Sequence, residues 1–275
     1  MAVDGRKSLA RMWEQWGDCT RCSLGEIRSA EGKPVVAGTG AKGKILVVLR
    51  SPTWKTEEGI PTDGEEFLYA LIRAYDAMEH IYVTYTTACR SCSPIIDEDT
   101  GQQKMRSTRR GLVPMYRDIP PSHEQRKACS DRLLEEVYLV DPVIVLACGD
   151  VAIQSLMGKA VSTASLVGNP THFTVPGAGI RPRVTEKRQV WGRKFQGQMI
   201  YPTEPAPVSY LMIPTYEPEI ALKATADHRP TSPAVQLKEH VREAVNLYTH
   251  SLDLTRDDKI ETPEPMYDDA EDLDV

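Results

Sequence analysis

The sequence lacks the features of membrane and exported proteins. None of its apolar runs approaches the about 20 residues that a helix needs to cross a bilayer, so a membrane role is not expected. Residues 1–16 contain no apolar core of the kind found in signal peptides, and their spacing is that of an amphipathic helix. We therefore expect a cytoplasmic protein, in which thiols stay reduced and clustered cysteines bind metal more often than they form disulfides.

The chain also lacks the net positive charge typical of nucleic-acid-binding proteins, since 33 Lys and Arg and 39 Asp and Glu give a net charge of −6. Residues 261–275 hold seven of the acids and no Lys or Arg, and removing those seven leaves 32 acidic residues against 33 basic ones. A nucleic-acid-binding role is therefore still open. Residues 256–275 are predicted to be a disordered acidic tail.

The chain holds six cysteines, and the pair Cys19 and Cys22 forms a Cys-x-x-Cys motif. Two thiolates at this spacing can hold a metal centre from a single turn, but a four-ligand zinc or iron–sulfur site needs two more ligands from elsewhere. The other cysteines are Cys89, Cys92, Cys129 and Cys148. Cys148 ends an apolar run and is expected in the core, where a thiol packs as a small apolar group. The sequence thus predicts a metal site and leaves its full ligand set open.

Short apolar runs rich in β-branched residues predict strands, and amphipathic stretches between them predict helices. The predicted strands are 44–49, 81–87, 143–147, 190–195, 198–201 and 210–214, and the predicted helices are 7–17, 65–78, 122–140, 149–158 and 232–251. Ser122 and Gln125 form a capping box at the start of the third helix. This alternation predicts an α/β fold, a three-layer α/β/α sandwich around a central, mainly parallel four-stranded sheet. The domain covers residues 1–255, with inserts at about 92–121 and 159–188.

Several separated stretches together resemble one protein family. They are residues 19–25 (CTRCSLG), 87–90 (TACR), 121–130 (PSHEQRKACS), 142–152 (PVIVLACGDVA), 191–193 (WGR) and 213–218 (IPTYEP). The first has the form Cys-x-x-Cys-x-Leu-Gly, and the last resembles a Thr-Tyr-His-Pro motif. In this order, over roughly residues 9–225, the chain resembles the iron–sulfur uracil-DNA glycosylases known as family 4, and the related family 5.

The resemblance implies that Cys19, Cys22, Cys89 and Cys129 hold a 4Fe–4S cluster. It also implies that the partner is DNA, with a base flipped out of the stack into a pocket. Zinc is the alternative metal. Cys92 lies three residues after Cys89 and could replace it as ligand.

The sequence departs from the family where the uracil pocket would lie. The family's Gly-Glu-Ala-Pro-Gly motif corresponds to residues 49–53 (LRSPT), which place Arg50 and Ser51 before the retained Pro52. The family's Gly-Arg-Pro-Phe-Val-Gly motif corresponds to residues 59–64 (GIPTDG), which keep the glycine and proline frame. The resemblance therefore predicts the scaffold better than it predicts the pocket.

Three further positions change the expected chemistry. Thr62, beside Asp63, stands where the family has a stacking phenylalanine. Tyr85 stands where an asparagine reads uracil, and Glu217 stands where a histidine polarises the departing base. A carboxylate there would repel the negative charge on a departing uracil unless it were protonated or paired with Arg50. Ordinary uracil excision is therefore not expected.

These comparisons give candidate residues and two hypotheses. The candidate catalytic residues are Glu217, Arg50 and Asp63, and the candidate base-pocket residues are Ser51, Pro52, Thr62 and Tyr85. The first hypothesis is a glycosylase-like enzyme that removes a base other than uracil. The second is a catalytically inactive DNA-binding or replication and repair accessory protein.

Basic clusters provide candidate contacts to single-stranded or flipped-out DNA. The candidate DNA-binding residues are Arg106, Arg109, Arg110, Arg193, Lys194, His228 and Arg229. The first three belong to an insert that has no acid between residues 100 and 117, which is also the composition of a solubilising loop. The acidic tail either docks on a protein partner or competes with DNA for the basic face.

Overall fold

A computed structural model of the chain describes residues 5–42, 44–108, 111–175, 194–195, 198–199 and 207–257. The residues outside these ranges include the basic candidates Arg109, Arg110 and Arg193 and the greater part of the predicted acidic tail. No helix in the described ranges is both long and apolar enough to cross a membrane.

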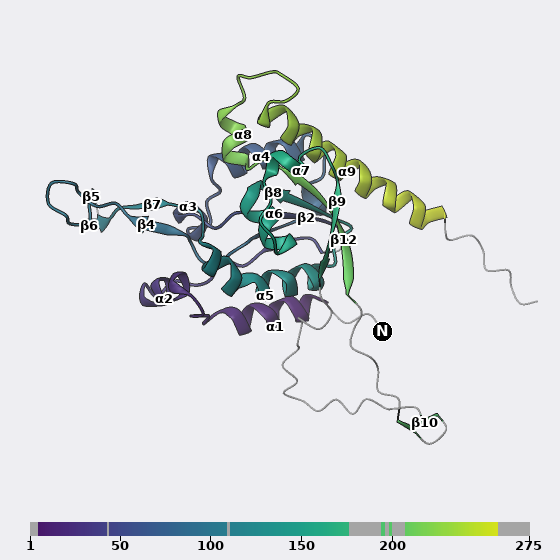
Figure 1. The fold of residues 1–275 in the computed structure, drawn as a ribbon, viewed down its shortest axis with the longest axis horizontal. Coiled ribbons are helices and arrows are strands. Elements are labelled where there is room, and N and C mark those ends of the chain that lie inside the picture. Colours follow the sequence, from purple (N-terminus) through teal and green to yellow (C-terminus); the bar gives the residue numbers. More distant parts are fainter. Residues whose placement is uncertain are drawn as a thin grey trace, which may run out of the picture.

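A mainly parallel sheet forms the centre of the protein (Figure 1). Its strands, in spatial order, are β1 (Thr39–Gly40), β3 (Ile81–Tyr85), β2 (Ile45–Leu49), β8 (Ile144–Cys148), β12 (Val208–Thr215) and β9 (Thr171–Val175). The middle four strands are mutually parallel, whereas β1 and β9 run antiparallel to their neighbours at the two edges. The predicted α/β fold with a mainly parallel sheet is thus confirmed, and the sheet has six strands where four were predicted.

Helices cover both faces of the sheet, which explains why β2, β3 and β8 are buried along their full length. One face packs against α4 (Asp63–Arg73), α8 (Pro218–Lys223) and α9 (Pro233–Asp257). The other packs against α1 (Gly5–Trp16), α5 (His123–Val140) and α6 (Gly149–Met157). The remaining helices are α2 (Ser23–Ala30), α3 (Trp54–Glu57), the 3-10 helix η1 (Met78–His80) and α7 (Thr163–Leu166). The predicted capping box of Ser122 and Gln125 is present at the start of α5.

The insert at 92–121, predicted to be an irregular loop, forms paired strands instead. Strand β4 (Cys92–Pro94) pairs with β7 (Tyr116–Asp118), and β5 (Met105–Thr108) pairs with β6 (Gly111–Pro114). Together they extend away from the body of the protein (Figure 1). These strands could not be predicted from the sequence. A ribbon that pairs only with itself has no buried face and therefore shows no alternation of apolar and polar residues.

Other differences concern strand boundaries at the far edge of the sheet. Strand β9 occupies part of the insert predicted at 159–188, and it alternates between buried and exposed residues as an edge strand does. The strands predicted at 190–195 and 198–201 are described only as β10 (Lys194–Phe195) and β11 (Gln198–Met199), which pair with each other and not with the central sheet.

A buried ion pair within α5 faces the sheet and hydrogen-bonds to it. The Arg132 guanidinium and the Glu136 carboxylate lie 2.6 Å apart and are 1% and 0% exposed. The carboxylate also accepts hydrogen bonds from the hydroxyl groups of Tyr82 and Thr84 on β3, at 2.8 and 2.6 Å. Each buried charge therefore has a charged partner, and the carboxylate has two further donors.

Replacing Arg132 by methionine should lower the free energy of unfolding by about 3–5 kcal/mol, because Glu136 would remain buried without its cation. Denaturant unfolding measures the loss. The double variant Arg132→Met with Glu136→Gln removes both charges and keeps an acceptor oxygen, so it should recover most of the lost stability. An Arg132→Met variant as stable as the wild type would show that the pair does not hold α5 to the sheet.

Candidate metal centre and candidate active site

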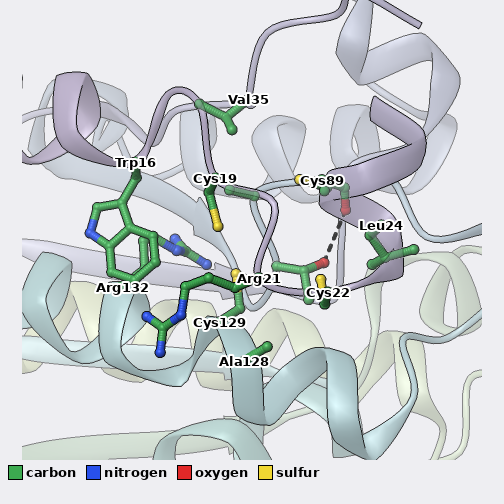
Figure 2. Close-up of a pocket in the computed structure, with 13 residues that line it drawn as sticks. Trp16, Cys19, Arg21, Cys22, Leu24, Val35, Cys89, Ala128, Cys129 and Arg132 are labelled. Atoms are coloured by element: carbon green, nitrogen blue, oxygen red, sulfur yellow. Dashed lines mark hydrogen bonds between the residues drawn. The ribbon is translucent and has the colours of Figure 1, made fainter. Parts of the chain in front are cut away.

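Four cysteines from three separate segments line one pocket (Figure 2). Cys19 follows α1, Cys22 is the N-cap of α2, Cys89 follows β3, and Cys129 lies on α5. The other residues around the pocket are Trp16, Arg21, Leu24, Gly25, Val35, Thr87, Ala88, Ala128 and Arg132. The fold thus brings together the two thiols of the Cys-x-x-Cys motif and two that are distant in sequence.

The two remaining cysteines lie elsewhere. Cys92 is in β4 at the base of the ribbon, where it is opposite Asp118 of β7. Cys148 ends β8 and is buried beneath the charged residue Glu217, and burial raises the pKa of its thiol. Of the two neighbouring candidates, the structure places Cys89 and not Cys92 at the pocket.

Helix α1 brings the Cys-x-x-Cys loop to α5. The indole N–H of Trp16 donates to Glu135 at 3.0 Å, and the Arg21 side chain donates to Asp131 at 3.0 Å. Both acceptors lie on α5, within six residues of Cys129. The packing of α1 along α5 therefore determines how close Cys19 and Cys22 lie to Cys129 (Figure 1).

A glycine and a buried arginine shape the loop itself. A β-carbon at Gly25 would lie 2.5 Å from the carbonyl oxygen of Cys19, so only glycine allows α2 to pack against the loop. Arg28 is 7% exposed and donates to the carbonyl oxygens of Cys19 and Lys33, at 3.1 and 2.6 Å. These contacts hold the Cys-x-x-Cys turn in one conformation before any metal binds.

Arg132 contributes positive charge to the same pocket. It donates to the main-chain carbonyl oxygens of Tyr85 and Thr86, at 2.5 and 2.9 Å, and so fixes the segment that leads to Cys89. The Nε atoms of Arg132 and Arg28 are both buried, and neither has a hydrogen-bond partner among the residues described. Two guanidinium groups near four thiolates would offset the negative charge of a bound cluster.

The thiol of Cys89 favours the protonated form in the absence of metal. Its pKa is raised to about 12, chiefly by burial, with a further contribution from the neighbouring Cys129 and Cys22 and an opposing one from Arg28. A ligand thiolate must lose its proton, so metal binding at Cys89 would release a proton at neutral pH.

Four thiols around one pocket are the donor set of either a 4Fe–4S cluster or a zinc ion. Zinc sits about 2.3 Å from each sulfur, which requires its sulfurs to lie about 3.8 Å apart. Within the described ranges, no group of three or more His, Cys, Asp or Glu is arranged to hold one metal ion. A 4Fe–4S cluster, in which each thiolate binds a different iron, stays the prediction for these four cysteines.

A second candidate site lies at the carboxyl ends of the parallel strands. The chain passes from β2 outward to β3 and then returns to the other side of β2 to form β8. Open α/β sheets bind their ligands at the carboxyl ends of strands where the order reverses in this way. Arg50 follows β2, Gly149 follows β8, and Glu217 follows β12.

Arg50 and Glu217 meet at this edge. The Arg50 Nη1 and Glu217 Oε1 atoms are 2.9 Å apart, and the two side chains are 24% and 18% exposed. Burial raises the pKa of Glu217 above its ordinary value, and the Arg50 charge opposes that shift. A β-carbon at Gly149, whose φ is +84°, would lie 3.1 Å from the Glu217 β-carbon, so glycine allows this close approach. Of the two conditions that would offset the Glu217 charge, pairing with Arg50 is therefore present.

Two of the predicted base-pocket residues bind other parts of the protein. The Tyr85 hydroxyl donates to Glu65 at 2.8 Å, and the second carboxylate oxygen of Glu65 accepts from the Thr62 N–H at 2.7 Å. Thr62 is the N-cap of α4 and, with Glu65, completes a capping box. Ser51 and Pro52 are buried beside them. The Thr-x-x-Glu pattern could have identified Glu65 from the sequence, but its contact with Tyr85 is long-range.

The third catalytic candidate, Asp63, does not join the charged pair. It lies in the first turn of α4, pairs with Lys55 at 2.8 Å, and its side chain is 74% exposed. This pair is an ordinary surface salt bridge, and the structure gives Asp63 no contact with Arg50 or Glu217 among the described interactions. We therefore do not retain Asp63 as a catalytic candidate.

The basic candidates for DNA binding that the structure describes come from separate elements. Arg106 lies in β5 and Lys194 lies in the separate strand β10. Arg229 follows α8 beside His228 and forms an exposed ion pair with Asp227 at 2.7 Å. This arginine lowers the pKa of Asp227 to about 2.

The comparisons with known proteins identify neither a family nor a function. No protein-family model matches the sequence, and a search of curated proteins found no match.

Replacing Cys89 by alanine should abolish the cluster, whereas the same change at Cys92 should leave it intact. After anaerobic purification, chemical analysis of the wild type should give about four iron and four sulfide per chain. The measurement compares the two variants, three residues apart, by iron and sulfide content and by visible absorption. Four cysteines that bind zinc, or a cluster lost from Cys92→Ala and kept in Cys89→Ala, would contradict the ligand set.

The raised pKa of Glu217 predicts a dependence of stability on pH. Folding favours the protonated carboxyl, so its contribution is present below the ordinary pKa of 4.5 and is lost as the pH rises through the raised value. A Glu217→Gln variant cannot ionise and should gain stability relative to the wild type as the pH rises above about 4.5. Denaturant unfolding at each pH measures the difference, with Glu66→Gln, an exposed acid on α4, as the control. The opposite trend would show that attraction to Arg50 outweighs burial.

Proposed function

We propose that the chain is an iron–sulfur protein of the uracil-DNA glycosylase type that binds DNA and hydrolyses the N-glycosidic bond of a base other than uracil. The observation that carries this proposal is the Arg50–Glu217 pair at the point where the strand order reverses. Four parallel strands with helices on both faces, and four cysteines around one pocket, support the corresponding fold and cluster.

The charged pair suits cleavage of a bond between sugar and base. The transition state of such cleavage places positive charge on the sugar and negative charge on the departing base. The Glu217 carboxylate would stabilise the sugar cation and take a proton from the water that attacks C1′. As the bond from C1′ to the base nitrogen breaks, Arg50 would donate a hydrogen bond to the base, which leaves with the bonding electrons. Burial of both side chains strengthens these interactions.

The residues around the pair argue against uracil as the base. Tyr85 and Thr62 already hydrogen-bond to Glu65, so neither provides the free donor and acceptor with which an amide reads the uracil edge. A carboxylate at residue 217 also has the wrong charge to polarise a uracil oxygen. A base with an exocyclic amino group could instead donate to Glu217.

A second candidate function is a catalytically inactive DNA-binding or accessory protein. It is favoured by the same internal interactions, because the polar groups of Tyr85, Thr62 and Glu217 all have partners within the protein. In that case the cluster would only join α1, α5 and the end of β3. The acidic tail, which lies largely outside the described residues, would then serve to dock a protein partner.

Incubation with duplexes that carry hypoxanthine, xanthine, uracil or a modified pyrimidine with an exocyclic amino group should produce abasic sites at one of the non-uracil bases, and the amino-bearing pyrimidine is the expected one. Strand breakage after alkali measures them. The Glu217→Gln variant should lose activity by at least about 100-fold, because it can neither accept a proton nor stabilise the sugar cation. Glu66→Gln carries the same charge change at the surface and should keep full activity.

The two functions give different results in this experiment. Salt-sensitive DNA binding without cleavage of any base would favour the accessory protein. Efficient excision of uracil would contradict the altered specificity, and full activity in Glu217→Gln would remove this residue from the mechanism.

A further inference from the structure

The insert forms a defined arm, residues 92–118, built from two short antiparallel ribbons. The ribbons are joined at one point, where the Ile95 carbonyl accepts from the Lys104 N–H at 2.7 Å and the Lys104 carbonyl accepts from the Met115 N–H at 2.8 Å. Figure 1 shows the arm extending well beyond the helices that surround it. A segment of this shape is not needed to complete the core.

The base of the arm is held in place. Arg90 pairs with Asp118 at 2.9 Å and lies 5.4 Å above the ring of Tyr116. The Ile119 N–H also donates to the Ser91 carbonyl at 3.0 Å, which closes the base. The outer ribbon is therefore presented in a fixed direction.

The outer ribbon exposes apolar side chains on one face. Leu112 is 69% exposed and Met105 is 48% exposed. Leu112 lies opposite Ser107, which is two residues after Met105 on the paired strand, so the three positions share a face of the ribbon. Exposed apolar side chains at the end of a projecting ribbon are typical of a contact surface rather than of a solvated loop.

Positive charge is concentrated in the outer part of the arm. Residues 100–117 contain five Lys or Arg and no Asp or Glu, whereas the arm's four acids lie at 97–99 and 118. Lys104 is paired with Asp97 at 3.6 Å, and Arg117 is exposed. This charge suits a polyanion and makes a second apolar protein surface a poorer partner.

The arm begins at the edge of the sheet that holds the Arg50–Glu217 pair. It follows Thr86, whose N–H donates to the carbonyl oxygens of Leu49 at 2.9 Å and Arg50 at 3.2 Å. The exits of β2 and β3 are therefore adjacent. A long ligand that reaches Glu217 would extend toward the arm.

We propose that the arm lies in a groove of duplex DNA and inserts Leu112 and Met105 between base pairs next to the target nucleotide. This inference rests on the proposed DNA-binding function and adds the element that opens the stack. Two-stranded ribbons fit a DNA groove, and apolar side chains inserted between base steps unstack them. The positive charge of the arm would bind the flanking phosphates.

The test uses the full-length wild-type protein and a duplex with 2-aminopurine, whose fluorescence rises when its stacking is lost. Wild-type protein should raise the fluorescence on binding. The double variant Met105→Ser with Leu112→Ser should abolish the rise and weaken duplex binding by about tenfold. The matched control is Met78→Ser with Val143→Ser, two exposed apolar residues at the opposite, amino edge of the sheet. It should behave as the wild type does.

The outcomes separate this inference from the proposed activity. Glu217→Gln should lose base excision and still raise the fluorescence, because insertion needs only the arm. A rise that persists in the arm variant, or a wild-type protein that excises a base without a rise, would overturn the role of the arm alone. Binding to single strands only, or to no DNA, would also overturn it.

Discussion

The buried guanidinium of Arg132 is the contact on which the rest of the structure most depends. It neutralises Glu136, holds the main chain at the end of β3, and lies at the wall of the cysteine pocket. A buried charge of this kind is stable only when all of its partners are in place. The position of α5, and with it Cys129, is therefore coupled to the segment that leads to Cys89.

That coupling relates the two candidate sites to each other. The end of β3 leads to Cys89 and then to the arm, and its first residue after the strand contacts the main chain of Arg50. A cluster bound at the pocket would therefore brace the same edge of the sheet at which Arg50 and Glu217 pair. In the proposed function, the metal centre would support the DNA-facing edge, and the charged pair would provide the chemistry.

Much of the fold could be predicted because its strong signals are local. The apolar runs predicted as strands at 44–49 and 143–147 and the capping box at Ser122 depend only on neighbouring residues, and they correspond to β2, β8 and the start of α5. The arm could not be predicted, because its strands pair with each other and leave no apolar alternation. The hydrogen bond from Tyr85 to Glu65 could not be predicted either, because it connects residues on different elements. Asp63 was chosen as a catalytic candidate from its place in a motif. Its side chain is exposed to solvent, which the motif alone does not reveal.

The most direct test of the account is an experimental structure of the anaerobically purified protein bound to duplex DNA that contains an uncleavable analogue of an abasic site. The account predicts a 4Fe–4S cluster on Cys19, Cys22, Cys89 and Cys129, with the extrahelical sugar within hydrogen-bonding distance of Glu217 or Arg50. DNA bound away from this edge of the sheet, or a pocket that holds a different metal on other residues, would contradict it.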